Sequence, residues 1–512
     1  MTDEARRSMV SSLLPFVVAT LGAVLMALAF PKTNAVVLAP IGAVGLFWAW
    51  FVVSPKRAFW IGWLAGTAFF TLSYWWFGET AGALIAPFGF LLTLGPAIGD
   101  AFFGFALVGA LVSFAAHGLT RRTRSVRALV PLAGAAAFAA GEWLRSEGLG
   151  QLAVPFANLG YTQVSSPLAP VAAFAGAYGI TFLLCAIAAY AAYAIRMRAV
   201  RGSGVDAALG LFGVVVCIAL AWTFWPARTL DPPAYRVAAI QGNIPQKLKF
   251  TKAAFFAALE RYESLTAQAA SDQPSLIVWP ETVIPTALNQ SPELQSRFAG
   301  LARAIHTELV VGTLWRSPDG IYNVLYFFRP DGGLDAVYRK RQLVPFAEHL
   351  PLGALLSRIP WAAEISHFAS GSSDGVVYVD GVRFGPIICW ESAFTDLVVG
   401  DVRDGAGALI IATDDAWFGT TAGPYQHAQI AQMRALETGR WIVRAASTGI
   451  SGFIAPNGRF TRATALDEQA VVTGVIGPPV DTAYDAIGGN AVAFAFVLVY
   501  VCVVAWSRRR GA

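Results

Sequence analysis

Hydrophobic residues follow two different patterns along this chain. Residues 10–226 and 490–507 consist mainly of long apolar runs, whereas residues 228–488 mix short apolar segments with charged and turn-forming residues, as soluble domains do. A helix needs about 20 predominantly apolar residues to cross a bilayer. Eight segments meet this requirement and are predicted to span a membrane: residues 10–30, 36–54, 58–77, 88–116, 128–145, 168–195, 206–225 and 490–507.

The fourth segment, residues 88–116, differs from the other seven. It is long, and it contains Pro96 and Asp100. Proline disturbs helical hydrogen bonding, and a carboxylate inside a bilayer is costly. We expect Asp100 to mark a break in this span; the alternative, a functional carboxylate within the membrane, stays open.

The apolar runs predict a division of the chain into three parts. Residues 1–227 are expected to form a transmembrane domain with seven spans, residues 228–488 a separate catalytic domain, and residues 489–512 a final span with a short tail. The first apolar run is too long for a cleavable signal peptide, lacks a small-residue cleavage signature and is followed by further spans. It is therefore expected to remain as an anchor.

Basic residues between the spans predict their orientation, because positively charged loops remain in the cytoplasm. Alternate loops hold only Lys32 and Arg145. All other loops and both ends carry clusters on one side of the predicted membrane, made of Arg6, Arg7, Lys56, Arg57, Arg121, Arg122, Arg124, Arg127, Arg196, Arg198, Arg201, Arg508, Arg509 and Arg510. Both termini are thus expected in the cytoplasm and residues 228–488 on the outer face. The clusters also account for the net charge of +5, so no nucleic-acid partner is implied.

Composition and cysteine usage sharpen this picture. Of 512 residues, 56% are hydrophobic and 13% are charged, compared with about 25% charged in a soluble domain. Cys185, Cys217 and Cys502 fall within predicted spans, so Cys389 is the one cysteine of the external domain and has no disulfide partner there. A lone thiol in an oxidising compartment is either a small buried hydrophobe or a nucleophile.

Short apolar segments within residues 228–488 predict alternating strands and helices. The predicted strands are 236–240, 275–281, 309–313, 322–328, 334–339, 376–379, 385–389, 408–413 and 450–455, and the predicted helices are 252–270, 291–306 and 424–440. A Pro-Asp-Gly-Gly turn at 330–333 joins two of the strands in a hairpin. This order predicts a mixed α/β layered domain.

Three reactive side chains follow predicted strands of this domain. Glu281 ends one strand, Lys340 follows the hairpin, and Cys389 ends a third strand just before a predicted helix start. A thiol at a helix N-terminus is favoured as thiolate by the helix dipole. Because active sites of α/β sheets gather at strand ends, a base, a cation and a thiol there predict a thiol acyl-transfer centre. Taken singly, the Glu and the Lys would more often be solvated surface charges.

Longer motifs surround these residues. They are WPET at 279–282, LVPFAEHLP at 343–351, ICWES at 388–392, DDAWFG at 414–419, GPYQHAQIAQMRALETGRWIVRA at 423–445 and, in the apolar half, NLGYTQ at 158–163. With them, Glu281, Lys340 and Cys389 resemble the Glu-Lys-Cys triad of the nitrilase superfamily. The membrane-embedded N-terminal half and the last span resemble one branch of it, the apolipoprotein N-acyltransferases. The resemblance implies an αββα sandwich for the external domain.

The chain departs from this family's pattern at several positions. The family commonly has Gly at Ala347, Asn at Asp414, Trp at Phe250 and tyrosine at Trp390, and an FPW-type loop where this chain reads Val-Pro-Phe at 154–156. These differences concern the surroundings of the triad, which is intact.

The resemblance implies a reaction and its substrates. Glu281 would be the general base, Lys340 would stabilise the oxyanion, and Cys389 would carry the acyl group as a thioester. The acyl donor would be a phospholipid, usually phosphatidylethanolamine, and the acceptor the α-amino group of an S-diacylglyceryl cysteine on an apolipoprotein, at the outer face of the bacterial inner membrane. Glu348 matches a family carboxylate that orients the lysine, and Glu391 and Trp390 are further supporting residues.

Several other residues are candidates for substrate contact. The apolar stretch 343–360, with Leu343 and Phe346, is expected to form a lid or lipid-dipping loop, as is the Trp417-Phe418 pair; ordinary core is the alternative. Glu142 and Arg145, near the outer end of the fifth predicted span, either contact a lipid headgroup or pair with each other.

Two other kinds of protein remain as alternatives. One is a membrane-anchored amidase that hydrolyses small amides with the same triad, and the other is a scaffold or transporter with a degenerate nitrilase domain. No cofactor is expected, because no phosphate-binding glycine loop occurs in context. No metal is expected, because no ligand spacing such as HExxH occurs among His117, His306, His349, His367 and His427.

Overall fold

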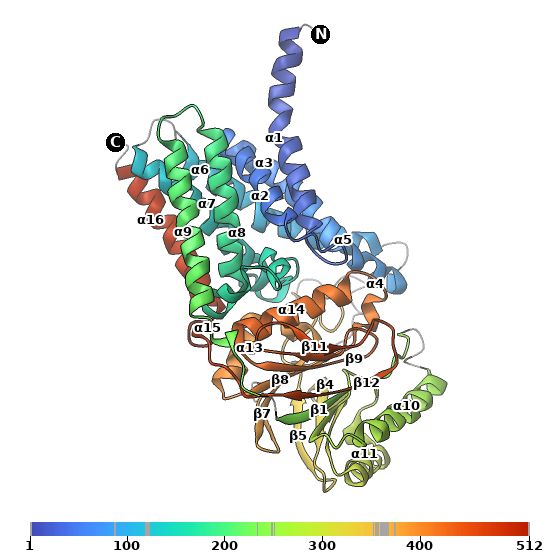
Figure 1. Ribbon diagram of the computed structural model, residues 1–512. Helices are drawn as coiled ribbons and strands as arrows, with labels where there is room; N and C mark the ends of the chain where they lie inside the picture. Colours follow the sequence, from blue (N-terminus) through green and yellow to red (C-terminus); the bar gives the residue numbers. More distant parts are fainter. Residues whose placement is uncertain are drawn as a thin grey trace. The chain divides into compact units, whose positions relative to one another are not determined.

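The computed structural model describes residues 3–85, 89–117, 123–232, 234–246, 249, 251–351, 353, 358, 368–372 and 375–509 (Figure 1). Phe250, His367, Arg121, Arg122, Arg510 and part of the predicted lid lie outside them. The chain forms two compact units. One contains Met1–Trp225 with Ile487–Ala512, and the other contains Pro226–Ala486.

The first unit is helical, and each of the eight predicted spans contains a helix. Its long helices are α1 (Asp3–Ala27), α2 (Leu38–Val52), α3 (Pro55–Ser73), α4 (Trp75–Ile85), α5 (Gly89–Ala101), α6 (Leu107–Ala116), α7 (Arg124–Trp143), α8 (Ala172–Arg196), α9 (Ser203–Thr223) and α16 (Gly489–Arg509). Among the described residues, four helical stretches are long and apolar enough to cross a membrane: Gly89–Ala116, Ala169–Arg196, Ser203–Thr223 and Gly489–Arg509. The count of eight spans stays a prediction.

The expected break at Asp100 takes an unexpected form. Helix α5 continues through Pro96 and Asp100 and passes through a π-helical turn, Phe102–Ala106, into α6. The chain therefore changes helix type after Asp100 and stays helical, as π-turns inside α-helices commonly do.

Helices α1 and α2 approach each other closely at glycine. A side-chain carbon at Gly22 would lie 2.4 Å from the carbonyl oxygen of Gly42, and one at Gly42 would lie 2.2 Å from that of Gly22. Any larger residue at either position would push the helices apart. Small residues at such crossings are typical of helices packed in membranes.

The second unit contains two six-stranded sheets. The first has the strand order β12-β1-β2-β3-β4-β5 and the second has the order β11-β10-β9-β8-β7-β6. The strands are β1 (Tyr235–Gln241), β2 (Leu276–Val278), β3 (Glu308–Ser317), β4 (Gly320–Phe328), β5 (Leu334–Arg339), β6 (Val377–Val379), β7 (Val382–Ile388), β8 (Ala408–Thr413), β9 (Trp441–Ala446), β10 (Gly452–Ile454), β11 (Phe460–Ala463) and β12 (Ala470–Ile476).

Successive side chains of a strand face opposite sides of its sheet, and this alternation gives the second unit four layers. In β1, Val237 and Ala239 join the core between the two sheets, whereas Ala238 and Ile240 pack on the side of α10 (Lys252–Ala270) and α11 (Pro292–Ile305). In β8, Ile410 faces the core between the sheets and its neighbours face α13 (Thr395–Arg403) and α14 (Gly423–Thr438). Successive strand side chains point to opposite faces, so each sheet buries both. Figure 1 shows the resulting αββα sandwich, as expected.

Most predicted elements of this unit are present, and five were missed. The predicted hairpin is the antiparallel pair β4–β5, in which Val324 lies opposite Arg339. The elements that were not predicted are the helices α13 and α15 (Ala483–Ile487) and the strands β9, β11 and β12. Strand β9 follows α14 within one long motif and carries no turn signal of its own except Gly439. Strand β12 adds to the edge of the first sheet by pairing antiparallel with β1.

Candidate active site

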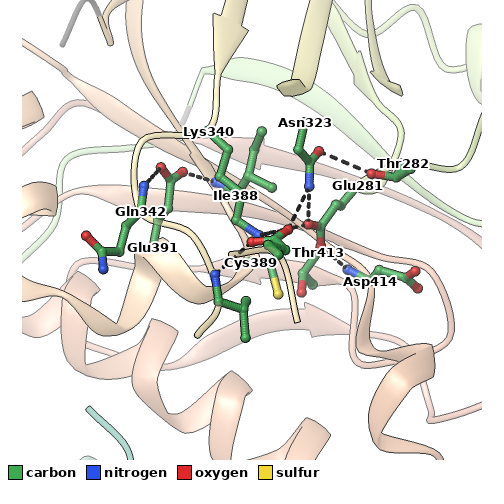
Figure 2. Close-up of polar contacts among 12 residues, drawn as sticks. Glu281, Thr282, Asn323, Lys340, Gln342, Ile388, Cys389, Glu391, Thr413 and Asp414 are labelled. Carbon is green, nitrogen blue, oxygen red and sulfur yellow. Dashed lines mark hydrogen bonds and ion pairs between the residues drawn. The ribbon is translucent and has the colours of Figure 1, made fainter. Parts of the chain in front are cut away.

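Three predicted reactive residues follow strands of the two sheets. Glu281 comes after β2, Lys340 directly follows β5, and Cys389 directly follows β7. The backbone N–H of Lys340 donates to the carbonyl oxygen of Asn323 on β4 at 2.8 Å, which continues the sheet to this residue. The first two residues therefore come from one sheet and the thiol from the other (Figure 2).

Lys340 is the centre of a buried ion-pair cluster. Its Nζ lies 3.1 Å from Oε1 of Glu281 and 2.8 Å from Oε1 of Glu348. Burial alone would lower the pKa of Lys340, but these two carboxylates raise it above its ordinary value. Lys340 is therefore a fixed cation at neutral pH, and Glu348 is one of its two carboxylate partners.

Asn323 on β4 completes this cluster and was missed from the sequence. Its Nδ2 donates to Oε1 of Glu281 at 2.7 Å, and its Oδ1 accepts from the Thr282 hydroxyl at 3.1 Å. The other oxygen of Glu281 accepts the backbone N–H of Asp414 at 2.9 Å. Glu281 is thus held by a cation, an amide and a backbone donor, which fixes the direction of its carboxylate (Figure 2).

Cys389 occupies an unusual backbone conformation at the turn out of β7. Its φ is +51°, in the left-handed region that residues with a Cβ rarely adopt. The turn continues as a single 3₁₀ segment, Cys389–Ala393. The side chain is 9% exposed. Such strained residues cluster at active sites, where the surrounding structure holds them in place.

The surroundings of Cys389 correct the expectation of a helix-stabilised thiolate. The segment after it is only five residues long, so no extended helix dipole acts on the sulfur. Burial raises the pKa of Cys389 well above its usual value, the Glu281 carboxylate raises it further, and Lys340 and a hydrogen bond with Thr413 lower it in part. The resting residue is therefore a neutral thiol that needs a base.

Glu391 ties the two sheets together at the site. Its Oε2 accepts the backbone N–H of Ile388 at 2.6 Å and the Tyr338 hydroxyl at 2.8 Å. Its Oε1 accepts the backbone N–H groups of Arg341 and Gln342 at 2.6 and 3.1 Å. One buried carboxylate therefore fixes the residues that follow Lys340 and the residue that precedes Cys389.

Asp414 takes part in a buried ion pair. Its side chain contacts Nζ of Lys249 and the hydroxyl of Ser447. Lys249 and Asp414 are both buried. Because the backbone N–H of Asp414 donates to Glu281, this pair anchors a loop that supports the base.

The predicted lid residues differ in exposure. Phe346 and Trp417 are exposed, at 43% and 38%, whereas Leu343 is buried. Phe418 is half-buried and packs edge-on against His427 at 6.0 Å between ring centres. Trp390, next to the nucleophile, is buried and its ring lies 6.2 Å from that of Phe394.

Arg145 in the helical unit does not form the ion pair with Glu142 that the sequence analysis considered. It pairs with Asp100, with 3.4 Å between NH1 and Oδ2. Glu142 accepts the backbone N–H of Leu159 at 2.7 Å and the Thr181 hydroxyl at 2.7 Å. Both side chains are buried and contact other protein groups, which favours a structural role.

Several groups near the thiol were not found from the sequence, namely Asn323, Thr413, Lys249, Ser392 and Asp415. None lies in a spacing that marks a site by itself, although Asp415 and Ser392 stand inside the quoted motifs. The described residues contain no group of three or more His, Cys, Asp or Glu side chains placed to hold a metal ion.

Two protein-family models match the two parts of this chain. Residues 236–479 match the model of the carbon-nitrogen hydrolase family, and residues 22–190 match that of the apolipoprotein N-acyltransferase N-terminal domain. A yeast Nit3 structure of the nitrilase superfamily aligns with 49% of this chain and 93% of its own, with 21% identity and a TM-score of 0.38.

Curated relatives match over most of the chain. The apolipoprotein N-acyltransferase of Allorhizobium ampelinum is 34% identical over 81% of this chain and 79% of its own length. That of Azotobacter vinelandii is 33% identical over 83% and 82%, and that of Methylococcus capsulatus is 31% identical over 96% and 95%. With both domains matched and the relatives covered along most of their length, the chain belongs to the apolipoprotein N-acyltransferase family.

Proposed function

We propose that this protein is an N-acyltransferase that carries an acyl group on Cys389. The observation that supports the proposal most directly is the meeting of a neutral buried thiol with a held carboxylate, Glu281, and a fixed ammonium, Lys340. The names of the relatives supply the class of reaction. The substrates are a phospholipid donor and an apolipoprotein acceptor, as in lipoprotein maturation.

In the first half-reaction, Glu281 takes the proton of the Cys389 thiol as the sulfur attacks the ester carbonyl carbon of the phospholipid. The new C–S bond pushes the carbonyl electrons onto oxygen, and Lys340 stabilises that oxyanion. The intermediate then breaks its bond to the glycerol oxygen. That oxygen leaves with the proton from Glu281 as a lysophospholipid, and a thioester remains on Cys389.

In the second half-reaction, an amine replaces the glycerol hydroxyl. Glu281 removes a proton from the amine as its nitrogen attacks the thioester, and Lys340 again faces the oxyanion. The C–S bond breaks, the sulfur regains a proton and an amide is formed. The acceptor is the N-terminal amine of an S-diacylglyceryl cysteine, and the two half-reactions follow a ping-pong order.

Membrane attachment follows from the substrates. Both carry acyl chains, and each CH₂ moved out of the bilayer costs about 0.8 kcal/mol. We place residues 1–227 and 489–512 in the bacterial inner membrane as eight spans, with both termini cytoplasmic, and residues 228–488 on the periplasmic face. The four long apolar helices among the described residues support the membrane assignment.

Two exposed aromatic residues are candidates for contact with acyl chains. Phe346 follows Lys340 closely in the chain, and Trp417 follows the loop that supports Glu281. Their exposure suits a role at a lipid surface or substrate entrance.

A labelling experiment tests the proposal. The full-length protein is incubated with phospholipid carrying a labelled acyl chain, and the label is expected on Cys389 as a hydroxylamine-sensitive adduct. Cys389→Ser should give no such adduct, whereas Cys502→Ala, a cysteine of α16, should label like the wild type. A wild type that never becomes labelled but hydrolyses small amides would instead be an amidase. A protein without either activity would support the scaffold alternative.

A further inference from the structure

A chain of buried polar side chains lies directly behind Cys389. Asp415, which follows β8, accepts from Arg444 on β9 at 2.6 Å and contacts Nδ1 of His427 on α14 at 2.8 Å. Nε2 of His427 lies 2.9 Å from the Ser392 hydroxyl. All four side chains are buried. None of them has a place in the proposed reaction described so far.

The chain ends on the backbone of the nucleophile. The Ser392 hydroxyl donates to the carbonyl oxygen of Cys389 at 2.8 Å, and Nε2 of His427 lies 3.2 Å from the same oxygen. A carbonyl oxygen can only accept, so Nε2 strengthens this hold only in a ring form that carries a proton on Nε2, whereas the Ser392 hydroxyl donates to it directly. Burial would raise the pKa of Asp415, but Arg444 and His427 hold it below its usual value. Ionised Asp415 therefore orients the ring, as carboxylates orient histidines elsewhere.

Ser392 contacts His427, and His427 contacts Asp415, as the serine, histidine and aspartate of a serine-hydrolase triad do. Ser392 is nevertheless not placed as a nucleophile. Its side chain is buried, and its hydroxyl proton is directed to the carbonyl of Cys389. A nucleophile must be reached by substrate. The arrangement therefore acts on the backbone next to the thiol.

Holding this carbonyl also sets the direction of the next N–H. The peptide group between Cys389 and Trp390 is planar and trans, so its N–H points opposite to its C=O. The same hold keeps Cys389 in its strained conformation with φ of +51°. A backbone N–H directly after a nucleophile is well placed to bind the oxyanion that forms on the attacked carbonyl.

We propose that Asp415, His427 and Ser392 are positioning residues for the oxyanion site. By fixing the Cys389 carbonyl, they aim the N–H of Trp390 at the oxygen that becomes negatively charged, opposite the ammonium of Lys340. This inference rests on the proposed acyl transfer at Cys389.

Two reactions of the Cys389 thiol can distinguish positioning of the oxyanion site from a general contribution to folding. Attack on an ester forms an oxyanion, whereas alkylation by iodoacetamide displaces iodide and forms none. In full-length His427→Ala and Ser392→Ala proteins, the rate of acyl adduct formation from labelled phospholipid is expected to fall about 100-fold, as for loss of an oxyanion donor. The rate of alkylation of Cys389 should change less than about threefold, because the thiol and Glu281 are unaltered.

Conservative variants and a matched control complete the test. Ser392→Thr keeps the hydroxyl and should recover most of the acylation rate, and His306→Asn, at an exposed histidine, should behave as the wild type. Undiminished acylation in both alanine variants would overturn the inference, and so would an equal fall of acylation and alkylation. A wild type that fails to form the adduct would instead refute the proposed function.

Discussion

Arg145 and Lys340 are both buried cations, but their surroundings differ in kind. Lys340 contacts two carboxylates, Glu281 and Glu348, beside a thiol. Arg145 contacts one carboxylate, that of Asp100, and otherwise neutral oxygens, which belong to Tyr74, Val154, Phe156 and Asn158.

The difference shows why burial of a charge does not by itself mark an active site. The guanidinium of Arg145 has several fixed donors, and backbone carbonyls of residues 154 and 156 use them to hold a loop. The ammonium of Lys340 instead contacts two carboxyl groups, and one of these, that of Glu281, lies near enough to Cys389 to interact electrostatically with its thiol. The first cluster fixes structure, and the second can accept a proton.

Replacement of Lys340 should have the largest effect. Lys340→Met removes the cation proposed to face the oxyanion, and the rate of Cys389 adduct formation should fall about 1000-fold or more. Rapid-quench labelling with phospholipid measures this rate. Lys56→Met, at an exposed lysine of α3, is the matched control and should not alter it. A Lys340→Met protein that forms the adduct at the wild-type rate would contradict the catalytic role assigned to Lys340 and not to Arg145.

Replacement of Arg145 should affect stability and leave the chemistry intact. Arg145→Met leaves Asp100 buried without its cation, which should cost about 3 kcal/mol of unfolding free energy. Thermal denaturation in detergent measures the loss, with exposed Arg196→Met as the control. The molecules that remain folded should label Cys389 at the wild-type rate. A selective loss of labelling without a loss of stability would assign Arg145 to substrate binding.

The Lys249–Asp414 ion pair is expected to have an effect that combines those of Lys340 and Arg145. It is a structural pair, but the backbone N–H of Asp414 donates to Glu281, the proposed base. Lys249→Met leaves the Asp414 carboxylate buried without its cation and should cost about 2–3 kcal/mol of unfolding free energy. Adding Asp414→Asn removes that charge and should restore most of the stability. Denaturation midpoints of both variants measure the coupling. Equal stability of the single and double variants would show that the two charges do not interact.

Glu308 provides a third comparison, because its buried carboxyl group forms no ion pair among the described residues. Its Oε1 has no hydrogen-bond partner among the described residues, and burial together with nearby Asp335 raises its pKa to about 7. The native state therefore holds this proton more tightly than the unfolded chain does. The loss of folding free energy caused by burying the ionised carboxylate is absent below about pH 4.5 and grows as the pH rises through 7. Glu308→Gln should therefore stabilise the protein by about 1–2 kcal/mol at pH 8 and hardly at pH 5.

Denaturation curves at the two pH values measure this effect. Glu293→Gln, at an exposed carboxylate of α11, serves as the control and should show no such dependence on pH. A stabilisation by Glu308→Gln that is equal at both pH values would contradict the raised pKa.

Local sequence signals predicted much of the second unit and pointed to three residues of the candidate site. Apolar segments bounded by turns located β1, β4, β5 and β8, and motifs located Glu281, Lys340 and Cys389. Strand β9 was missed because its apolar run follows a helix without a distinct break. Asn323 was missed because a polar residue within a strand gives no sign of its partner 42 positions earlier in the chain.

The sequence by itself determined where apolar runs occur, which thiol stands apart from them, and which charged residues follow strands. These features depend on residue type and local spacing. Only the tertiary structure decided that Cys389 is a neutral buried thiol, that Glu391 links the two strand ends, and that His427 contacts the Cys389 carbonyl. The pKa and orientation of a side chain depend on groups that are distant in sequence and become neighbours only when the two sheets pack together.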